Sequence, residues 1–306
     1  MSLSPNLQGA VYMTVAMAGF TVNDAITKFV SEEMNPAQIM LVRGLFACVF
    51  VGLLAWRRGA LADLRLALQP MVGLRVAAEV FATVTFLAAL AHLPIANVSA
   101  VLQALPLAVT MGAALVFGEG VGWRRWLAIA AGFAGVLVIV RPGFEGFSLY
   151  SLLALASVFF CAVRDLATKR IPQHVPTLLV STMTTLVIML TGGLLLQPFG
   201  GWTPMSGQSF GLLALASVLL LIGYQAIITA MRMGEISFIA PFRYTSLLSS
   251  IMLGLVIFGD VPDLAMIVGA LVIVMSGLYT LYRERVVGPR RPAAESTGPA
   301  MEPDGI

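Results

Sequence analysis

The sequence predicts an all-α integral membrane protein of ten transmembrane helices, arranged as two inverted five-helix repeats. Three observations lead to this fold class. The chain of 306 residues is 59% hydrophobic and only 11% charged, whereas soluble domains carry about 25% charged residues. Ten apolar stretches are long enough to cross a bilayer, and short motifs recur at a single offset of 141 residues.

The ten stretches follow from the length of helix that a bilayer requires, which is roughly 20 apolar residues. They are separated by short joints rich in Pro, Gly and charge, and they cover residues 8–30, 36–56, 70–92, 95–117, 123–141, 147–169, 174–197, 208–232, 235–258 and 262–282. The joints leave no room for a folded soluble domain. The Pro- and Gly-rich segment 286–306 is predicted to be a disordered cytoplasmic tail.

Basic residues in the short joints predict the orientation of the chain. With the N-terminus in the cytoplasm, twelve of the 18 Lys and Arg residues fall on the cytoplasmic side and only Arg141 falls on the opposite side. The other five lie within spans or at their ends. We therefore expect a multi-pass membrane protein with both termini in the cytoplasm, which requires an even number of spans.

Two separate pairs of motifs share one offset. The stretch "VNDAITK" at 22–28 matches "VRDLATK" at 163–169, and "FGE" at 117–119 matches "FGD" at 258–260, each 141 residues further on. One offset that relates two motifs indicates an internal repeat of nearly half the chain.

Each repeat holds five spans, the first in residues 8–141 and the second in residues 147–282. Because five is odd, the second repeat enters the membrane from the opposite side. Inverted repeats recur in secondary transporters, where the site between the halves opens to either side in turn. A receptor or an enzyme has no comparable need for this symmetry.

The repeated motif carries a charged pair in each half, Asp24 with Lys28 and Asp165 with Lys169. Residues four apart lie on one helical face and can pair, which would neutralise charge near lipid. The functional interpretation is that the two pairs gate the pathway on opposite sides. The two interpretations are compatible.

Polar residues inside the spans are costly and therefore mark candidate functional positions. Arg75 and Glu79 are four apart, so they suit a structural pair, or Glu79 suits substrate binding or proton coupling. Arg243 follows Pro241, and a guanidinium binds planar rings and carboxylates. The expected substrate-binding residues are Asn23, Glu79, Gln103, Tyr224, Gln225, Arg243 and Tyr244. For each of them, hydrogen bonding between helices is the structural alternative.

Several classes of site are not expected. Cys48 and Cys161 lie in apolar runs and are interpreted as small buried hydrophobes. The sequence lacks a phosphate loop, an H-E-x-x-H motif and a Cys/His cluster, so we expect no enzyme activity, catalytic residue, cofactor, metal site or nucleic-acid partner. Small residues at Gly118–Gly122 and Ala128–Gly132 favour close packing of the fifth span and leave a homodimer open.

Longer stretches carry a resemblance to a known family. These are "APFRYTSLLSSIMLGLVIFGD" at 240–260, the matching "SAVLQALPLAVTMGAALVFGE" at 99–119, and the opening "MAGFTVNDAITKFVSEEMNPAQIMLVRG" at 17–44. Together they resemble the EamA-type drug/metabolite transporter superfamily. The opening is similar to the branch with bacterial riboflavin and S-adenosylmethionine transporters. The resemblance implies a ten-helix bundle with its cavity between spans 1, 3 and 4 and their partners 6, 8 and 9.

The function expected from the sequence is secondary transport of a small organic metabolite by alternating access, with riboflavin uptake in first place. The alternative is transport or efflux of S-adenosylmethionine or an amino-acid-type metabolite. A non-transporting membrane scaffold is the alternative from another class, and the polar residues of the inverted repeat argue against it.

Overall fold

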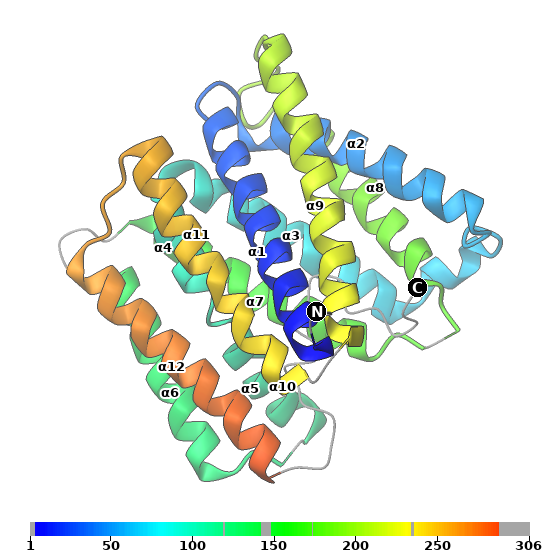
Figure 1. The fold of residues 1–306 in the computed structure, drawn as a ribbon. Coiled ribbons are helices and arrows are strands. Elements are labelled where there is room, and N and C mark those ends of the chain that lie inside the picture. Colours follow the sequence, from blue (N-terminus) through cyan, green and yellow to red (C-terminus); the bar gives the residue numbers. More distant parts are fainter. Residues whose placement is uncertain (1–3, 119, 142–147, 173, 234–235, 288–306) are drawn as a thin grey trace.

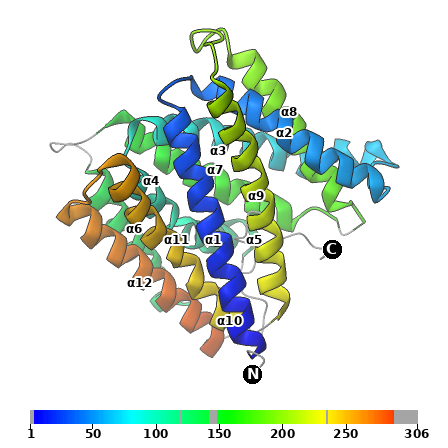
Figure 2. The same cartoon turned by 45° about the horizontal axis from the view of Figure 1, so that its top comes forward.

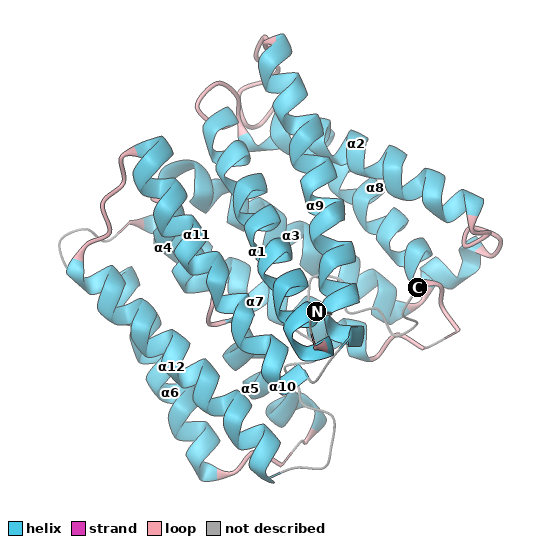
Figure 3. Cartoon of the chain, in the orientation of Figure 1, coloured by secondary structure: helices cyan, strands magenta, loops and turns pink. Residues whose placement is uncertain are grey.

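The computed structural model describes residues 4–118, 120–141, 148–172, 174–233 and 236–287, and in these residues every regular element is a helix (Figure 3). The first half contains α1 (Pro5–Val30), α2 (Pro36–Arg57), η1 (Leu64–Leu68), α3 (Pro70–His92), α4 (Ile95–Leu102), α5 (Leu105–Phe117) and α6 (Trp123–Val140). The second half contains α7 (Leu149–Lys169), α8 (Thr177–Leu195), α9 (Gly207–Met233), α10 (Ile236–Ile239), η2 (Ala240–Tyr244), α11 (Thr245–Leu253), the π-helical turn η3 (Gly254–Phe258) and α12 (Leu264–Val287).

The ten predicted spans are all helical, and the predicted fold class is confirmed. The fourth span is divided into α4 and α5, and the ninth into α10, η2, α11 and η3. Within the described residues, nine helical stretches are long and apolar enough to cross a membrane. The remaining span is α1, which has 26 residues. Residue 119 and most of the predicted tail, 288–306, lie outside the described residues.

The helices of the two halves pair with one another across the molecule (Figures 1 and 2). The first span packs along the eighth (α1 with α9) and the third along the sixth (α3 with α7), while α2 packs with α8, α4 with α11 and α6 with α12. Spans 1 to 5 correspond to spans 6 to 10. Under this exchange the pair of spans 1 and 8 becomes the pair of spans 6 and 3, and each of the other three pairs is exchanged with itself. The two halves are therefore related by a two-fold axis, as inverted repeats require.

The second repeated motif has one backbone conformation in both halves. Gly118 ends α5 and Gly259 ends η3, with φ angles of 67° and 68°. This left-handed conformation is strained for residues with a Cβ and is a common way to end a helix. Positions 141 residues apart therefore share a helix-ending turn as well as similar residues.

The two divided spans break at equivalent positions. Gln103 stands between α4 and α5, and Tyr244, 141 residues later, stands at the junction of η2 and α11. Pro106 and Pro241 lie beside these breaks, and each removes a backbone donor from the helical ladder. Discontinuous helices in membranes expose backbone polar groups where a protein-lined cavity can receive them.

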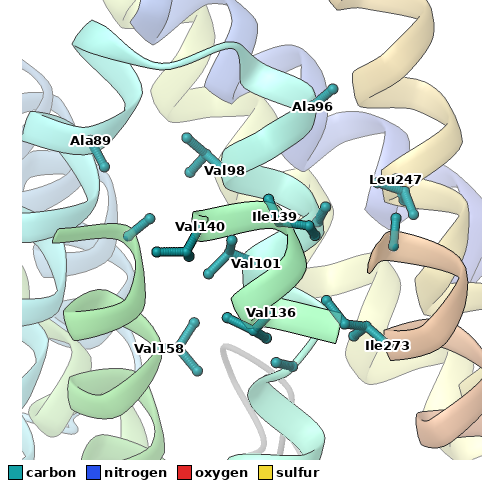
Figure 4. Packing of buried hydrophobic residues seen from close by; sticks show 14 of the residues in the cluster. Ala89, Ala96, Val98, Val101, Val136, Ile139, Val140, Val158, Leu247 and Ile273 are labelled. Atoms are coloured by element: carbon teal, nitrogen blue, oxygen red, sulfur yellow. The ribbon is translucent and has the colours of Figure 1, made fainter. Parts of the chain in front are cut away.

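The largest core cluster joins helices of both halves. Figure 4 shows Val98 and Val101 of α4 beside Val136 and Val140 of α6, with Ile273 of α12 facing them. The cluster also includes buried residues of α3, α7 and α11. It therefore holds α4, the first part of the divided fourth span, against α6 and α12.

Small residues allow α6 and α12 to approach closely. A Cβ on Gly135 would lie 2.8 Å from the carbonyl oxygen of Gly269, and a Cβ on Gly132 would meet Leu107 of α5. The small-residue stripe of α6 is thus covered by helices of the same chain. Gly118 and Gly122 lie in the joint between α5 and α6, so they form no helical stripe, contrary to the spacing-based expectation.

Candidate functional site

A cavity of about 550 Å³ lies in the middle of the bundle, between helices of both halves. Residues of α1, α2, α3, α4, α7, α8 and α9 line it, together with residues at the two helix breaks. Five of the six spans implied by the family resemblance lie among these helices, and the sixth, span 9, contributes through η2 and α11. The second and seventh spans, α2 and α8, take part as well.

Six of the seven predicted substrate-binding residues line this cavity. They come from different elements and are Asn23 on α1, Glu79 on α3, Gln103 at the first break, Tyr224 and Gln225 on α9, and Arg243 in η2. Asp24 of the first charged motif lines it too. The chain thus gathers six of the residues singled out for binding into one space, although they span more than 200 positions of sequence.

Tyr244 is the exception. Its side chain is 9% exposed and packs with its hydroxyl against the backbone position of Gly277 on α12. The preceding residue, Arg243, lines the cavity, and neighbouring residues of a helical turn point in different directions. Tyr244 is therefore a packing residue between η2 and α12 in this structure, which corrects its assignment to the cavity.

A buried charge network joins α3 to α7 at the cavity wall. Arg164 donates from Nε to Asp165 Oδ1 at 2.8 Å and from NH1 to the two Glu79 carboxylate oxygens at 3.2 and 3.3 Å. One guanidinium thereby holds two carboxylates. Such pairing satisfies charges that would be costly to bury singly.

Arg75 does not pair with Glu79, the partner predicted from the sequence, but with two threonines. Its Nε donates to Thr168 Oγ1 at 3.1 Å and its NH1 donates to Thr184 Oγ1 at 2.7 Å. Glu79 is held by Arg164 instead. The pairing predicted from a spacing of four residues is thus replaced by contacts between helices that are distant in sequence.

The repeated motif also pairs differently from what its spacing predicts. The Lys28 ammonium donates to the backbone carbonyl oxygens of Leu90 and Leu93 at 3.2 and 2.6 Å. Asp24 accepts from Asn23 at 3.0 Å. In the second half Asp165 is held by Arg164, as described above, and Lys169 is exposed at the end of α7. Their predicted gating role stays a prediction.

Aromatic side chains form one part of the cavity wall. Phe20 and Tyr224 are in edge-to-face contact, with ring centroids 5.3 Å apart, and both line the cavity. Phe50 and Phe86 line it from α2 and α3. These rings give the cavity flat apolar surfaces of the kind that stack on or edge against planar ligands.

The two helix breaks meet at the cavity. Gln103 donates from Nε2 to Ser246 Oγ at 2.6 Å, and Ser246 donates to the carbonyl oxygen of Arg243 at 3.0 Å. Thr21 of α1 contacts the carbonyl oxygen of Ser246 at 3.4 Å. The polar groups freed by the breaks in both halves are therefore connected by side chains.

Sequence reasoning missed several lining residues, among them Thr83, Ser99 and Ser246. Single hydroxyl residues within apolar spans give little contrast in hydropathy. Arg43 also lines the cavity. Its NH1 group lies 3.4 Å from Thr27 Oγ1 on α1.

Cations outnumber anions among the lining residues. The arginines are Arg43, Arg58, Arg75, Arg164 and Arg243, and the carboxylates are Asp24 and Glu79. Asp165 adds a third carboxylate directly behind Arg164. The cavity therefore carries a positive formal charge, and it repels a cationic ligand more than a neutral or an anionic one.

Comparison with known proteins matches nearly the whole chain. The sequence model of the EamA-like transporter family matches twice, at residues 7–141 and 148–282. A riboflavin transporter of Vibrio cholerae is 31% identical over 275 residues, which cover 88% of this chain and 91% of the relative. An S-adenosylmethionine uptake transporter of Rickettsia prowazekii is 22% identical, over 93% of this chain and 96% of the relative.

A solved crystal structure shares the fold at low sequence similarity. It superposes with a TM-score of 0.63 at 18% identity and covers 92% of this chain and 99% of its own. At this identity the match concerns the arrangement of helices alone.

Proposed function

The chain belongs to the EamA-like transporter family, and from this premise we propose that it carries riboflavin into the cell. It is a membrane metabolite transporter, with multiple spans in the bacterial inner membrane. The substrate, the inward direction and the residues that bind are our proposal. It depends most on one observation, the combination of aromatic rings and carboxamides around the central cavity.

The size and chemistry of the cavity suit a flavin. Its volume of about 550 Å³ lies within the roughly 300–1,000 Å³ of small-molecule sites. Phe20 and Tyr224 offer ring faces and edges to an isoalloxazine system. Gln103 and Gln225 offer amide groups, which both donate and accept hydrogen bonds and so match the alternating polar edge of a flavin.

The charge of the cavity favours riboflavin over the second candidate. Riboflavin is uncharged at neutral pH, whereas S-adenosylmethionine carries a sulfonium and an ammonium group against one carboxylate. Arg43 and Arg243 lie on walls that such a cation would have to approach. S-adenosylmethionine uptake remains the second candidate because a relative of that name aligns over nearly the whole chain and because Asp24 and Glu79 offer carboxylates.

The proposed orientation places both termini in the cytoplasm, on the grounds of the basic joints described above. Reporter fusions that are active in the cytoplasm should be active at both ends and in the joint Arg57–Arg65, and inactive in the joint Glu32–Asn35. Activity in that last joint would reverse the orientation.

Transport by this chain is tested in a bacterium that cannot make riboflavin. Expression of the chain should restore growth on low external riboflavin and uptake of the labelled vitamin, and excess unlabelled S-adenosylmethionine should not compete. A lack of rescue, with the protein present in the membrane, rules out the vitamin. Uptake of S-adenosylmethionine instead establishes the second candidate, and uptake of neither leaves metabolite efflux or a scaffold. Loss of uptake on collapse of the proton gradient, and in Glu79→Gln, would identify a coupled step.

Two tyrosines provide a matched pair for the site itself. Tyr224 lines the cavity against Phe20, whereas Tyr12 on α1 is 41% exposed on the outside of the bundle. Tyr224→Leu should lower riboflavin uptake by about tenfold, which is the upper range for one aromatic contact. Tyr12→Leu should leave uptake unchanged. Equal uptake by both variants removes Tyr224 from the site.

A further inference from the structure

The cavity reaches one end of the bundle and stops short of the other. At one end its lining includes Leu54 and Arg58, at the end of α2, and Leu178, at the start of α8; Arg58 is exposed. This is called the Arg58 end. Toward the opposite end, the lining residues that reach furthest include Asp24 on α1, Arg43 on α2 and Ser99 on α4.

The closed part has the thickness of about one to two helical turns. Asp24 lies six residues before the end of α1 at Val30, and Arg43 lies seven residues after the start of α2 at Pro36. Ser99 lies only four residues after the start of α4 at Ile95. At 1.5 Å per residue, roughly 6–10 Å of helix separates these lining residues from the ends of their helices. Lys28 lies inside this layer, which is called the Lys28 end.

Lys28 ties three spans together within the layer. Its Nζ donates to the carbonyl oxygens of Leu90 and Leu93 at the end of α3, at 3.2 and 2.6 Å. Its ammonium also lies over the ring of Phe258 in η3, 5.4 Å from the centroid. The last carbonyls of a helix lack partners within it and carry partial negative charge, so a lysine from α1 binds them strongly.

Charge around Lys28 reinforces these contacts. Glu32 and Asp260 attract the ammonium, and the buried Oδ2 of Asp260 accepts no hydrogen bond from the described residues. Gln38, at the start of α2, donates from Nε2 to the carbonyl oxygen of Thr203 and accepts from the Thr203 backbone N–H, each at 2.9 Å. These bonds join α2 to the segment between α8 and α9. The Lys28 end is thus held by polar contacts between both halves.

The equivalent residues at the Arg58 end make different contacts. Lys169, 141 residues after Lys28, is exposed at the end of α7. Phe117, 141 residues before Phe258, lies under the guanidinium of Arg170 at 4.4 Å. Lys28 is therefore half-buried and bonded to α3 at the closed end, whereas Lys169 is exposed at the open end. A cation lies over the equivalent Phe ring at both ends.

We infer that Lys28 is the latch that holds its end of the pathway shut, and that its release from the end of α3 and from Phe258 opens the cavity there. The inference rests on the transport function proposed above, because a pathway that alternates must open at both ends. The latch joins α1, α3 and the ninth span, all of which also contribute to the cavity. Its opening therefore changes the cavity wall directly.

The test measures which end admits a membrane-impermeant thiol reagent. Cys161 lines the cavity, so it reports access once Cys48 is replaced by alanine. In wild type, Cys161 should react when the reagent is supplied at the Arg58 end and be protected from the Lys28 end, as compared in inside-out and right-side-out vesicles. In Lys28→Met, labelling from the Lys28 end should rise on the order of tenfold or more, the scale of hydrogen bonds from a charged donor.

The controls separate the latch from general loosening. Lys28→Arg keeps a cation with several donors and should label like wild type. Lys169→Met removes the equivalent cation and should not open the Lys28 end. Unchanged labelling in Lys28→Met, or wild-type labelling from the Lys28 end, overturns the proposal. If Lys28→Met does not reach the membrane, Phe258→Leu takes its place, and unchanged labelling there overturns it.

The labelling needs no substrate. Failure of riboflavin uptake with the expected labelling would therefore remove the substrate proposal and leave the latch. Uptake of riboflavin with unchanged labelling would remove the latch and leave the substrate.

Discussion

Removal of Arg164 should destabilise the fold more than removal of either carboxylate that it holds. The guanidinium pairs with Asp165 at 2.8 Å and with Glu79 at 3.2 Å, and the Arg164 and Asp165 side chains are 9% and 3% exposed. Without the guanidinium, two carboxylates stay near each other in a medium of low dielectric. Breaking a buried pair in this way costs about 3–5 kcal/mol.

Substitutions of Arg164 and of Asp165 should differ in cost, because Arg164 holds two carboxylates and Asp165 pairs with one guanidinium. Arg164→Met should lower the free energy of unfolding by about 3–5 kcal/mol. Asp165→Asn leaves Arg164 paired with Glu79 and should cost only about 1 kcal/mol, the net value of one hydrogen bond. The double variant Arg164→Met/Asp165→Asn should be more stable than Arg164→Met alone, because one uncompensated carboxylate is gone.

The assay is reversible unfolding in mixed micelles with increasing denaturing detergent, followed by tryptophan fluorescence. Arg57→Met, at the exposed end of α2, is the control and should change stability by less than about 0.5 kcal/mol. Stability of Arg164→Met within that same margin would refute the network as a structural element. Strict additivity of the two substitutions would show that Arg164 and Asp165 do not stabilise each other.

Three further predictions concern local contacts. Gly277→Ala should destabilise the protein by about 1–3 kcal/mol, because its Cβ would collide with the Tyr244 hydroxyl and overpacking costs this much; thermal unfolding should show Tyr244→Phe relieving part of the loss. Gln103→Leu should cost about 1 kcal/mol in the same assay, because the hydrogen bond to Ser246 joins the two helix breaks. The backbone N–H of Met266, in the first turn of α12, and the guanidinium of Arg141 hold the pKa of the Asp263 carboxyl below its usual 3.8. The stabilisation from this carboxylate is present above pH 3.8 and is lost as the pH falls through the lowered pKa. Asp263→Ala should therefore make the free energy of unfolding depend less on pH in acid.

The fold was predictable because it follows from hydropathy and one offset. The predicted span 70–92 has the same limits as α3, and the other spans differ from their helices by at most five residues at an end. Bilayer thickness leaves little freedom in helix length. Gly118 and Gly259 each end a helix with nearly the same positive φ angle, so the helix-ending turn recurs in both halves.

The membership of the cavity was largely predictable, and the partners of its charges were not. Polar residues in apolar spans must face protein or water, so Gln103 and Arg243 were identifiable from their positions alone. Their facing direction within a broken helix was harder, and Tyr244 was assigned to the wrong side of η2. A helical wheel does not apply across a change from a 3₁₀ turn to an α-helix.

The ion pairs predicted from a spacing of four residues were wrong for Arg75 and Lys28, because these cations donate hydrogen bonds to acceptors on distant segments. The hydroxyl groups of Thr168 and Thr184 and the last carbonyls of α3 are partly buried acceptors, and inside a protein a bond to a cation is worth more than an exposed contact between side chains four apart. Arg75 and Lys28 bond to these groups. The sequence identifies the cationic donors, Arg75 and Lys28, but only the packed bundle shows which hydroxyl and carbonyl oxygens accept their hydrogen bonds.

The contrast between Lys28 and Lys169 follows from the symmetry of the chain. A molecule whose two halves made equivalent contacts would be closed at both ends or open at both, since the two-fold axis exchanges the ends. A transporter that opens one end at a time must therefore break its own symmetry in each state. The motif at 22–28 and its copy at 163–169 differ in this way in the structure, because Lys28 is half-buried and bonded to the end of α3, whereas Lys169 is exposed. If Lys28 is the latch proposed above, this motif is one place where the symmetry is broken.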